Sequence, residues 1–486
     1  MAEAAQSPYA SGQRVIAVDL DGTLVLTDML LENLFLFLRL HPLRLFSLFA
    51  WILGGKAHFK RMLANAVLPN VECLPYSQPL IDWLRAQKEA GAMLVLATAS
   101  DLRIARKVAD HVGIFDIVLG TEKTNLASVA KRDALSERYG SKGFEYVGNS
   151  SADYAVWRDA GVVHVANPER GVLRKAKDIA ACGVMGMVFD SRPRYGKSLI
   201  RSLRLHQWAK NLLLFVPLMA SHRFTEVSLV MAGVLAFIAF GACASSVYLL
   251  NDLLDLNDDR QHRTKRNRPL ASGELPILHA VLLTPLLLVL AFGLALALLP
   301  QVFAMVLAGY YVLTLSYSLV LKRLVMIDVV MLALLYTVRV IAGAAAMTLV
   351  TTFWILAFCM FIFLSLAFIK RYTELYDARE SGLNKTVGRG YLASDFELLA
   401  SLGGASGYIS VLVLALYIND ASAQRLYQSP QWMWLACPLL LFWMSRVWLL
   451  AHRGQMHDDP IVFALRDAAS LWIGVAFVAV FAMASF

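Results

Sequence analysis

The second part of the chain consists of long apolar runs separated by short polar segments. About 20 consecutive apolar residues form a helix that crosses a bilayer, so these runs predict about nine membrane-spanning helices. The predicted spans lie near residues 199–221, 229–250, 277–298, 301–320, 325–348, 351–369, 397–418, 431–450 and 467–486. Pro300-Gln301 marks the turn between the third and fourth spans. The pattern therefore predicts an all-α transmembrane bundle.

The first part of the chain has a different pattern. Up to about residue 195, strand-like and helix-like segments alternate and the charge density is ordinary. Over the whole chain 17% of residues are charged, against about 25% in an average soluble protein, and the deficit lies after residue 195. We therefore expect two domains: a soluble α/β domain over residues 1–190 and a membrane domain over residues 191–486.

Positive charge is distributed unevenly among the predicted loops. The loops at 251–275, 322–323, 370–395 and 451–466 are rich in Lys and Arg, whereas the alternate loops are not. The positive-inside rule places the basic loops in the cytoplasm. The N-terminal residues do not resemble a secretory signal, so the N-terminal domain is expected on the same side of the inner membrane. An odd number of spans then puts the C-terminus on the opposite side.

The net charge of +9 has two interpretations. It could indicate a nucleic-acid-binding protein, but the sequence contains no recognisable module of that kind. Basic loops that face an anionic lipid leaflet explain the charge better. We therefore expect the bilayer, and no nucleic acid, as a partner.

An apolar strand-like run, VIAVDLDGTLV, contains the aspartates Asp19 and Asp21. Two carboxylates at i and i+2 just past a strand reach the same crevice, which is where open α/β sheets bind ligands. There Asp19 can attack phosphorus as a nucleophile and Asp21 can shuttle a proton. Both can also help to hold Mg²⁺, a cation that prefers carboxylate oxygens.

The stretch around these aspartates resembles the first motif of the haloacid-dehalogenase (HAD) superfamily of phosphatases. Three later stretches resemble the other motifs of that superfamily, in the same order: MLVLATAS, NLASVAKRDALSERYG and FEYVGNSSADYAVW. The resemblance implies a Rossmann-like parallel sheet with a helical cap over about residues 29–85.

The same resemblance implies roles for four further residues. Thr98 and Lys131 are the expected phosphate ligands, and Asp153 and Asn149 are expected to complete the magnesium site with the two aspartates of the first motif. The family pattern usually has Asp where Asn149 stands, and a neutral amide is a weaker magnesium ligand. An inactive HAD fold, kept for structure, is the alternative.

The expected cap contains the stretch MLLENLFLFLRLHPLRLFSLFAWILGG at residues 29–55. Charged residues and a proline interrupt it, so amphipathic helices near the membrane interface are favoured over a span. Two interpretations remain open. Either the cap approaches the membrane, so that the phosphatase site can reach a lipid-linked substrate, or it packs only on its own domain.

A dense polar block, NDLLDLNDDRQHRTKRNRP, follows a predicted span. If the helix continues into it, Asp252, Asp255 and Asp259 fall at i, i+3 and i+7 and share one face. Carboxylates that share a face repel each other unless a cation lies between them. Mg²⁺ bound to a diphosphate is such a cation, because a few carboxylates and substrate phosphates commonly hold it together. Lys265 and Arg268 follow and can neutralise phosphate oxygens. A solvated charged loop is the structural alternative.

This block resembles the N-D-x-x-D-x-x-x-D motif and the following basic segment of the UbiA superfamily of intramembrane prenyltransferases. The likeness covers roughly residues 195–486 and includes the nine-span plan. It implies that Asn251 and the three aspartates handle the Mg²⁺ diphosphate. The stretches LRLHQWAKNLLLFVPL, LYTVRVIAGA, KRYTEL and HDDPIVFALRD resemble the branch that joins 5-phosphoribosyl 1-diphosphate to decaprenyl phosphate.

In that branch the soluble sugar donor carries the diphosphate, and the lipid phosphate attacks the anomeric carbon. The expected ligands of phosphate groups are Lys210, Arg268, Lys322, Lys370 and Arg371, with Asp458 and Asp459 for metal or ribose. The polar segment at 370–391 is more basic than the second D-x-x-x-D motif of family members that use aromatic acceptors.

Arg339 lies well inside a predicted span, where an ionised side chain is costly and usually faces a cavity or a partner. Asp328 precedes it by about three helical turns and so lies on the same face. We favour a substrate phosphate as the partner of Arg339; a structural ion pair between helices is the alternative.

The resemblances together predict a bifunctional membrane enzyme. It transfers 5-phosphoribosyl to polyprenyl phosphate, and its HAD domain then removes the 5-phosphate to give polyprenyl phosphoryl ribose. Mg²⁺ is the expected cofactor of both sites, and a homo-oligomer is left open. One alternative is an aromatic-acceptor prenyltransferase of quinone or tetrapyrrole pathways with an unrelated phosphatase. The other is a membrane scaffold in which only the HAD domain is catalytic.

Overall fold

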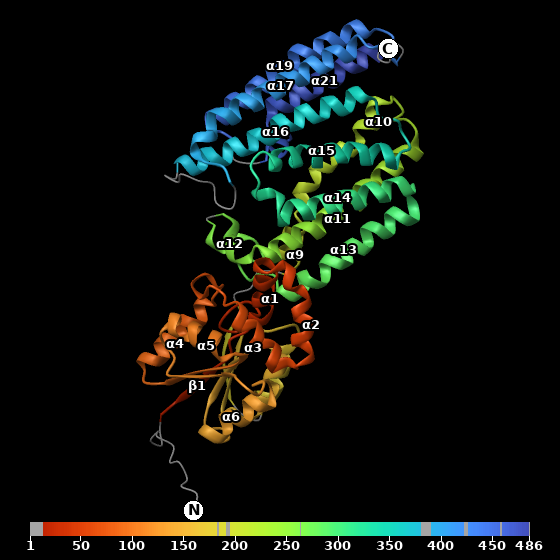
Figure 1. Cartoon of the computed structure of the whole chain (residues 1–486). Helices are drawn as coiled ribbons and strands as arrows, with labels where there is room; N and C mark the ends of the chain where they lie inside the picture. Colours follow the sequence, from red (N-terminus) through yellow and green to blue (C-terminus); the bar gives the residue numbers. More distant parts are fainter. Residues whose placement is uncertain are drawn as a thin grey trace, which may run out of the picture. The chain divides into compact units, whose positions relative to one another are not determined.

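The computed structural model describes residues 13–181, 184–190, 195–262, 264–380, 390–421, 426–456 and 459–485. The chain folds into two compact units (Figure 1). The first comprises Met1–Leu203 and Tyr248–Thr284, and the second comprises Arg204–Val247 and Pro285–Phe486. The polar block with the three aspartates therefore belongs to the same unit as the N-terminal domain.

The first unit is built on a six-stranded, fully parallel sheet with the strand order β3-β2-β1-β4-β5-β6. The strands are β1 (Val15–Val18), β2 (Met93–Asp101), β3 (Ile117–Thr121), β4 (Glu145–Gly148), β5 (Val162–Ala166) and β6 (Val184–Phe189). The helices that connect them are α4 (Gln78–Glu89), α5 (Leu102–Val112), α6 (Val129–Tyr139), α7 (Tyr154–Asp159) and α8 (Val172–Ala180). Parallel strands with crossover helices are the predicted α/β architecture.

Both faces of the sheet are covered. Ile16 and Val18 of β1 pack into one apolar cluster, whereas Val15 and Ala17 pack into the other. Successive side chains of a strand point to opposite faces, so a strand buried on both sides reads as a continuous apolar run. This explains why β1 is apolar at every position.

The cap consists of α1 (Met29–Leu40), η1 (Pro42–Arg44), α2 (Leu45–Leu53) and α3 (Lys56–Ala66). The predicted cap boundary near residue 85 lies within α4. Leu80 and Leu84 of α4 belong to the apolar cluster of the sheet, so this helix is part of the α/β core. The helices of the cap therefore end before it.

Eight helices in the part of the chain that the structure describes are long and apolar enough to cross a membrane. They are α11 (Val227–Leu254), α13 (Ile277–Leu298), α14 (Gln301–Leu319), α15 (Ile327–Ala346), α16 (Phe353–Glu380), α17 (Phe396–Ile418), α19 (Ala436–His452) and α21 (Ala468–Ser485). Pro300 is the N-cap of α14, as expected from the predicted turn. The chain is a multi-pass membrane protein with a helical bundle.

The prediction of one continuous helix over 199–221 is wrong. This segment contains the end of α9 (Tyr195–Leu203), then η4 (Leu205–Phe215), a 3₁₀-helix, and α10 (Val216–Ala220). Pro217 at the start of α10 and the left-handed backbone of Arg204 separate these pieces. At about 2.0 Å per 3₁₀ residue and 1.5 Å per α residue, η4 and α10 extend roughly 30 Å, the thickness of a bilayer core. Both pack along α15.

Candidate active sites

The turn after β1 presents the first pair of aspartates. Asp19 donates its backbone N–H to Val147 of the neighbouring strand β4, which fixes the start of the turn at the sheet edge. Gly22 has a φ of +71°, and a Cβ there would lie 2.2 Å from Asn149 Nδ2. Only glycine fits this backbone and this close approach. The D-L-D-G-T sequence therefore holds Asn149 against the same turn.

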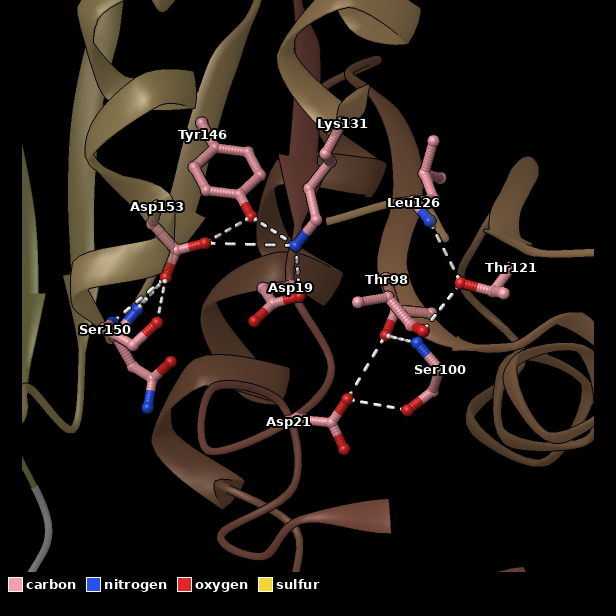
Figure 2. Close-up of polar contacts among 12 residues, drawn as sticks. Asp19, Asp21, Thr98, Ser100, Thr121, Leu126, Lys131, Tyr146, Ser150 and Asp153 are labelled. Atoms are coloured by element: carbon pink, nitrogen blue, oxygen red, sulfur yellow. Dashed lines mark hydrogen bonds and ion pairs between the residues drawn. The ribbon is translucent and has the colours of Figure 1, made fainter. Parts of the chain in front are cut away.

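Asp19 is the centre of a buried ionic network (Figure 2). Lys131 Nζ donates to Asp19 Oδ1 at 2.6 Å and to the Tyr146 hydroxyl at 2.9 Å. Tyr146 in turn donates to Asp153 Oδ1 at 2.8 Å. Burial raises the pKa of Asp19 to about 7, and the charge of Lys131 opposes this shift. Lys131 therefore favours the carboxylate form that a nucleophile needs.

Asp21 faces the end of strand β2 (Figure 2). Its Oδ2 accepts hydrogen bonds from Ser100 Oγ at 2.7 Å and from Thr98 Oγ1 at 3.4 Å, and its Oδ1 accepts one from the Met29 backbone N–H at 2.7 Å. Ser100 was not predicted. It follows Thr98 by two residues on an extended strand, so the period of two could have revealed it.

Lys60 of α3 is a second unpredicted residue near this site. Its Nζ donates to the Ala99 carbonyl at 2.7 Å and to Asn125 Oδ1 at 2.9 Å. Burial lowers the pKa of Lys60, and the charges of Asp21 and Asp28 oppose the shift. No sequence motif marked this residue, because only the folded cap brings it to the strand end. It places a cation from the cap beside strand β2, next to the residues predicted to bind phosphate.

The donor set at this turn fits Mg²⁺ in type. Asp19 and Asp21 on the turn, with Asn149 and Asp153 after β4, supply carboxylate and amide oxygens, which this cation prefers. Among the described residues, no three acidic groups converge on one point here, so Mg²⁺ would also need ligands from the substrate. Asp153 Oδ2, however, already accepts bonds from the backbone N–H groups of Asn149 and Ser150. Asp153 thus positions the Asn149 loop, and its role as a metal ligand remains a prediction.

The acid block, which is the polar segment with the three aspartates, continues α11 after one break in the helix. Helix α11 ends at Leu254 and α12 (Leu256–Gln261) follows, with a non-helical backbone at Asp255. Asp255 still donates its N–H to the Asn251 carbonyl at 2.9 Å, and Asp259 donates to Asp255 at 2.8 Å. The expected helical spacing of the aspartates is therefore preserved, with a local change of direction at the middle one.

Two of the three aspartates converge on one cation. Arg268 Nη1 donates to Asp252 Oδ1 at 3.1 Å and to Asp259 Oδ2 at 2.5 Å. Burial raises the pKa of Asp259, and Arg268 opposes this shift. A single nitrogen that contacts both carboxylates shows that a cation fits between them. Among the described residues no point is surrounded by three His, Cys, Asp or Glu groups, so Mg²⁺ here would need ligands from a diphosphate as well.

The cap helix α1 contacts this block within the first unit. Arg260 of α12 and Glu32 of α1 form a bidentate ion pair, with distances of 2.5 and 3.0 Å. Arg39 of α1 pairs with Asp258, and its Nε lies 3.9 Å from Asp255 Oδ1. The middle aspartate of the predicted triad therefore lies near a basic residue of the N-terminal cap. No sequence pattern indicated this contact, because Glu32 and Arg260 lie far apart in the chain.

Three predicted residues meet in the second unit. Asp459 Oδ2 accepts hydrogen bonds from Lys210 Nζ at 2.7 Å and Lys370 Nζ at 3.1 Å, and Tyr336 donates to the same oxygen at 3.1 Å. Burial disfavours the charge of Asp459, but the two lysines hold its pKa well below the usual range. A cavity of about 300 Å³ adjoins it, lined by His206, Gln207, Asp459, Val462 and Arg466.

Arg339 of α15 is buried among neutral groups. Its guanidinium donates to Asn211 Oδ1 at 3.1 Å and to the Tyr310 hydroxyl at 3.0 Å. It also lies 5.4, 5.0 and 5.7 Å from the ring centroids of Phe240, Tyr310 and Tyr336, which is cation–π distance. These contacts hold the charge in place, and phosphate binding by Arg339 remains a prediction.

Asp328 lies about three helical turns from Arg339 on α15, which is too far for an ion pair between the two. Asp328 Oδ2 instead lies 2.6 Å from Arg371 Nε, and its Oδ1 accepts a hydrogen bond from Tyr391 at 2.6 Å. Arg371 also donates to Glu374 and to Tyr317. Arg371 was predicted to bind phosphate, and its side chain is engaged here in a buried network between helices. The network gives that residue a structural role.

The other predicted residues occupy loops or fall outside the described residues. Lys265 is exposed in η5 (Lys265–Asn267), and Lys322 is half-buried in η6 (Leu321–Arg323). Asn251 lies in the last turn of α11. Asp458 lies outside the part of the chain that the structure describes. Their assigned roles stay predictions.

The fold and these sites define a class: a multi-pass membrane protein with a paired-carboxylate site, joined to a parallel α/β domain whose first strand ends in a turn with two aspartates. The model of the UbiA prenyltransferase family matches residues 212–474. The chain belongs to the UbiA prenyltransferase family. The match lies within the predicted membrane domain and confirms the predicted membership of the UbiA family.

Three relatives extend the comparison. The chain is 36% identical to the uncharacterized protein y4nM of Sinorhizobium fredii over 96% of this chain and 90% of that protein, so both units have counterparts there. It is 36% identical to the nodulation protein NoeC of Azorhizobium caulinodans over 58% of this chain and 91% of that protein. It is 29% identical to the decaprenyl-phosphate phosphoribosyltransferase of Mycolicibacterium smegmatis over 58% of this chain and 92% of that protein.

Two solved structures have a limited similarity to this chain. A UbiA homologue from Archaeoglobus fulgidus, bound to GPP and Mg²⁺, has a TM-score of 0.45 at 18% identity and covers 60% of this chain and 100% of its own. A phospho-aspartyl intermediate analogue of phosphoserine phosphatase has a TM-score of 0.27 at 13% identity and covers 37% of this chain and 95% of its own. The family assignment rests on the sequence matches.

Proposed function

We propose that the membrane domain transfers a 5-phosphoribosyl group from phosphoribosyl diphosphate to a polyprenyl phosphate. An oxygen of the lipid phosphate forms a bond to the anomeric carbon, the bond between that carbon and the diphosphate oxygen breaks, and diphosphate leaves. Asp252 and Asp259 would hold Mg²⁺, which stabilises the charge on the leaving diphosphate. Lys210 and Lys370 are the preferred ligands of further phosphate oxygens. The similarity to decaprenyl-phosphate phosphoribosyltransferases supports this proposal.

The N-terminal domain would act second, on the 5-phosphate that the transfer leaves on the lipid. Asp19 attacks the phosphorus, and the ribose 5-oxygen leaves with a proton from Asp21. Water then hydrolyses the aspartyl phosphate and releases inorganic phosphate. Lys131 and Thr98 hold the phosphate oxygens. The observation that carries this sequence of steps is that the buried Asp19–Lys131 pair and the acid block occur in one chain.

The first experiment tests the transfer itself. Purified full-length protein is incubated with polyprenyl phosphate, Mg²⁺ and phosphoribosyl diphosphate labelled in the ribose, and the lipids are extracted. We expect label in the lipid phase from the wild type and none from Asp252→Asn. The transfer proposal fails if the wild type transfers no label while its preparation is folded.

The second experiment separates the two steps. In Asp19→Asn the labelled lipid should retain its 5-phosphate, whereas the wild type should yield polyprenyl phosphoryl ribose. Asp82→Asn is the matched control, because Asp82 is an exposed residue of the same domain. Fully dephosphorylated lipid from Asp19→Asn would refute the role of the N-terminal domain but leave the transfer intact.

The same assay distinguishes the two alternatives. An aromatic-acceptor prenyltransferase would instead label an aromatic acid from a labelled prenyl diphosphate. A scaffold would label no lipid, yet would still hydrolyse soluble phosphomonoesters. The similarity to the phosphoribosyltransferases favours the sugar donor over the aromatic acceptor.

We also propose that the N-terminal domain and the basic loops face the cytoplasm of the cell, with the C-terminus across the inner membrane. The excess of Lys and Arg in alternate loops supports this orientation. A reporter that is active only in the periplasm, fused after the last residue, should be active. An inactive but expressed reporter would contradict the orientation.

A further inference from the structure

The second helix of the cap leaves an apolar face uncovered. Helix α2 contains no charged residue, and its one hydroxyl belongs to Ser47. Large apolar side chains of η1 and α2 are exposed: Leu43, Leu45, Phe46, Phe49, Ile52 and Leu53. Leu43 and Leu53 are exposed to 94% and 89%. Apolar patches of this kind on a folded domain mark a binding surface.

The opposite face of α2 is packed in the ordinary way. Leu48 is buried in a small cluster with Phe37 and Leu63, and Trp51 lies against the Phe37 ring with centroids 5.2 Å apart. The helix therefore has apolar side chains on two sides, only one of which its own domain covers. A helix that is apolar all round is normally buried on all sides.

The charged residues in the stretch of sequence that contains this face are all basic. Between Glu32 and Glu72 the chain contains no acidic residue, but it contains five Lys or Arg residues. Three of them are exposed: Arg44 directly before α2, Lys56 at the start of α3, and Arg61 further along α3. An apolar helix face framed by basic side chains matches a membrane surface with anionic lipids.

The contacts of α1 attach the cap close to a point where the chain enters the membrane. The Glu32–Arg260 and Arg39–Asp258 pairs join α1 to α12, which begins two residues after the spanning helix α11 ends. All of these residues belong to the first unit. Helices α1 and η1–α2 together are apolar enough for a span, but they meet at a bend of 115°. Such a bend suits a pair of helices that lies at the interface better than one that crosses it.

We propose that η1 and α2 form a lipid-binding surface, in which the exposed face defined by Leu43, Phe46, Phe49 and Leu53 is immersed in the interfacial layer of the bilayer. The membrane is the partner of this face, because the chain is embedded in a bilayer and the exposed charged residues of the neighbouring segments are Lys and Arg. The phosphatase domain is thereby held with its cap at the membrane surface. That position suits a lipid-linked phosphomonoester, a consequence that rests on the proposed function.

Spin labels can locate this face in the full-length protein without any assay of function. Single cysteines replace Phe46, Phe49 or Leu53 in a background that lacks the five native cysteines, and the labelled protein is reconstituted into nanodiscs that contain anionic lipid. Collision with apolar oxygen is compared with collision with a water-soluble nickel chelate. We expect the three labels to be accessible to oxygen and protected from the chelate.

Matched positions calibrate the result. A label at Leu286, an exposed residue of the spanning helix α13, defines the lipid signal, and a label at Val129, an exposed residue of α6, defines the aqueous signal. Labels on α2 that collide freely with the chelate would overturn the proposal. So would labels shielded from both reagents, because a protein surface or a second copy would then cover the face. Either result leaves the proposed transfer and phosphatase steps untouched.

Discussion

The buried ion pair between the cap and the acid block offers a quantitative test. Glu32 and Arg260 each have side chains only 3% exposed, and Glu32 also accepts a hydrogen bond from Thr27 Oγ1 at 2.7 Å. The variant Glu32→Gln keeps the shape of the side chain but removes its charge. The guanidinium of Arg260 then remains buried with the Ala271 carbonyl and a neutral amide as its partners.

Removal of one partner of a buried ion pair costs about 3–5 kcal/mol. The lower end applies here, because glutamine can still accept one hydrogen bond from Arg260. A loss of about 3 kcal/mol lowers the Tm of a unit of this size by roughly 6–12 °C. We also expect slower phosphoribosyl transfer, because Arg260 lies next to Asp259 on α12.

The measurement is thermal unfolding of the purified protein in detergent, followed by intrinsic fluorescence. Glu72→Gln is the control, since Glu72 is exposed in η2 (Val71–Cys73) and the substitution is the same. The double variant Glu32→Leu/Arg260→Met should recover most of the lost stability, because it removes both charges. Equal Tm values for Glu32→Gln, Glu72→Gln and the wild type would refute the reasoning.

Three further predictions concern single sites. Gly22→Ala should abolish most phosphatase activity and leave the transfer unchanged. A positive φ costs about 1–2 kcal/mol for alanine, and the added Cβ would collide with Asn149. Hydrolysis of a soluble phosphomonoester measures this effect. Asp328→Asn should destabilise the membrane unit by about 3 kcal/mol, the lower end for a broken buried ion pair, because Arg371 is only 1% exposed but keeps Glu374 as a second counter-charge; thermal unfolding in detergent measures it. Chelation of Mg²⁺ by EDTA should stop label transfer, and excess Mg²⁺ should restore it; transfer that persists in EDTA would contradict the use of the paired carboxylates as a metal site.

The sequence alone determined the parts of this protein that depend on short-range pattern. Apolar runs of span length predicted the membrane helices, because a helix in lipid must satisfy its backbone within one continuous segment. The apolar strand before D-L-D-G-T predicted the turn with Asp19 and Asp21, and the i, i+7 spacing of Asp252 and Asp259 predicted that they share a face. These inferences need only the helical and strand periods.

Only the tertiary structure decided which charged groups meet. Arg339 and Asp328 share one face of α15 but lie about 16 Å apart along it. Asp328 pairs with Arg371 of another helix, and Arg339 lies among aromatic rings. Glu32 and Arg260 come together because the cap folds onto α12. A buried charge binds whichever opposite charge or polar group packing brings within reach, and spacing along one helix cannot show that choice. For the same reason the uncovered face of α2 became visible only when the packing of its other face was known.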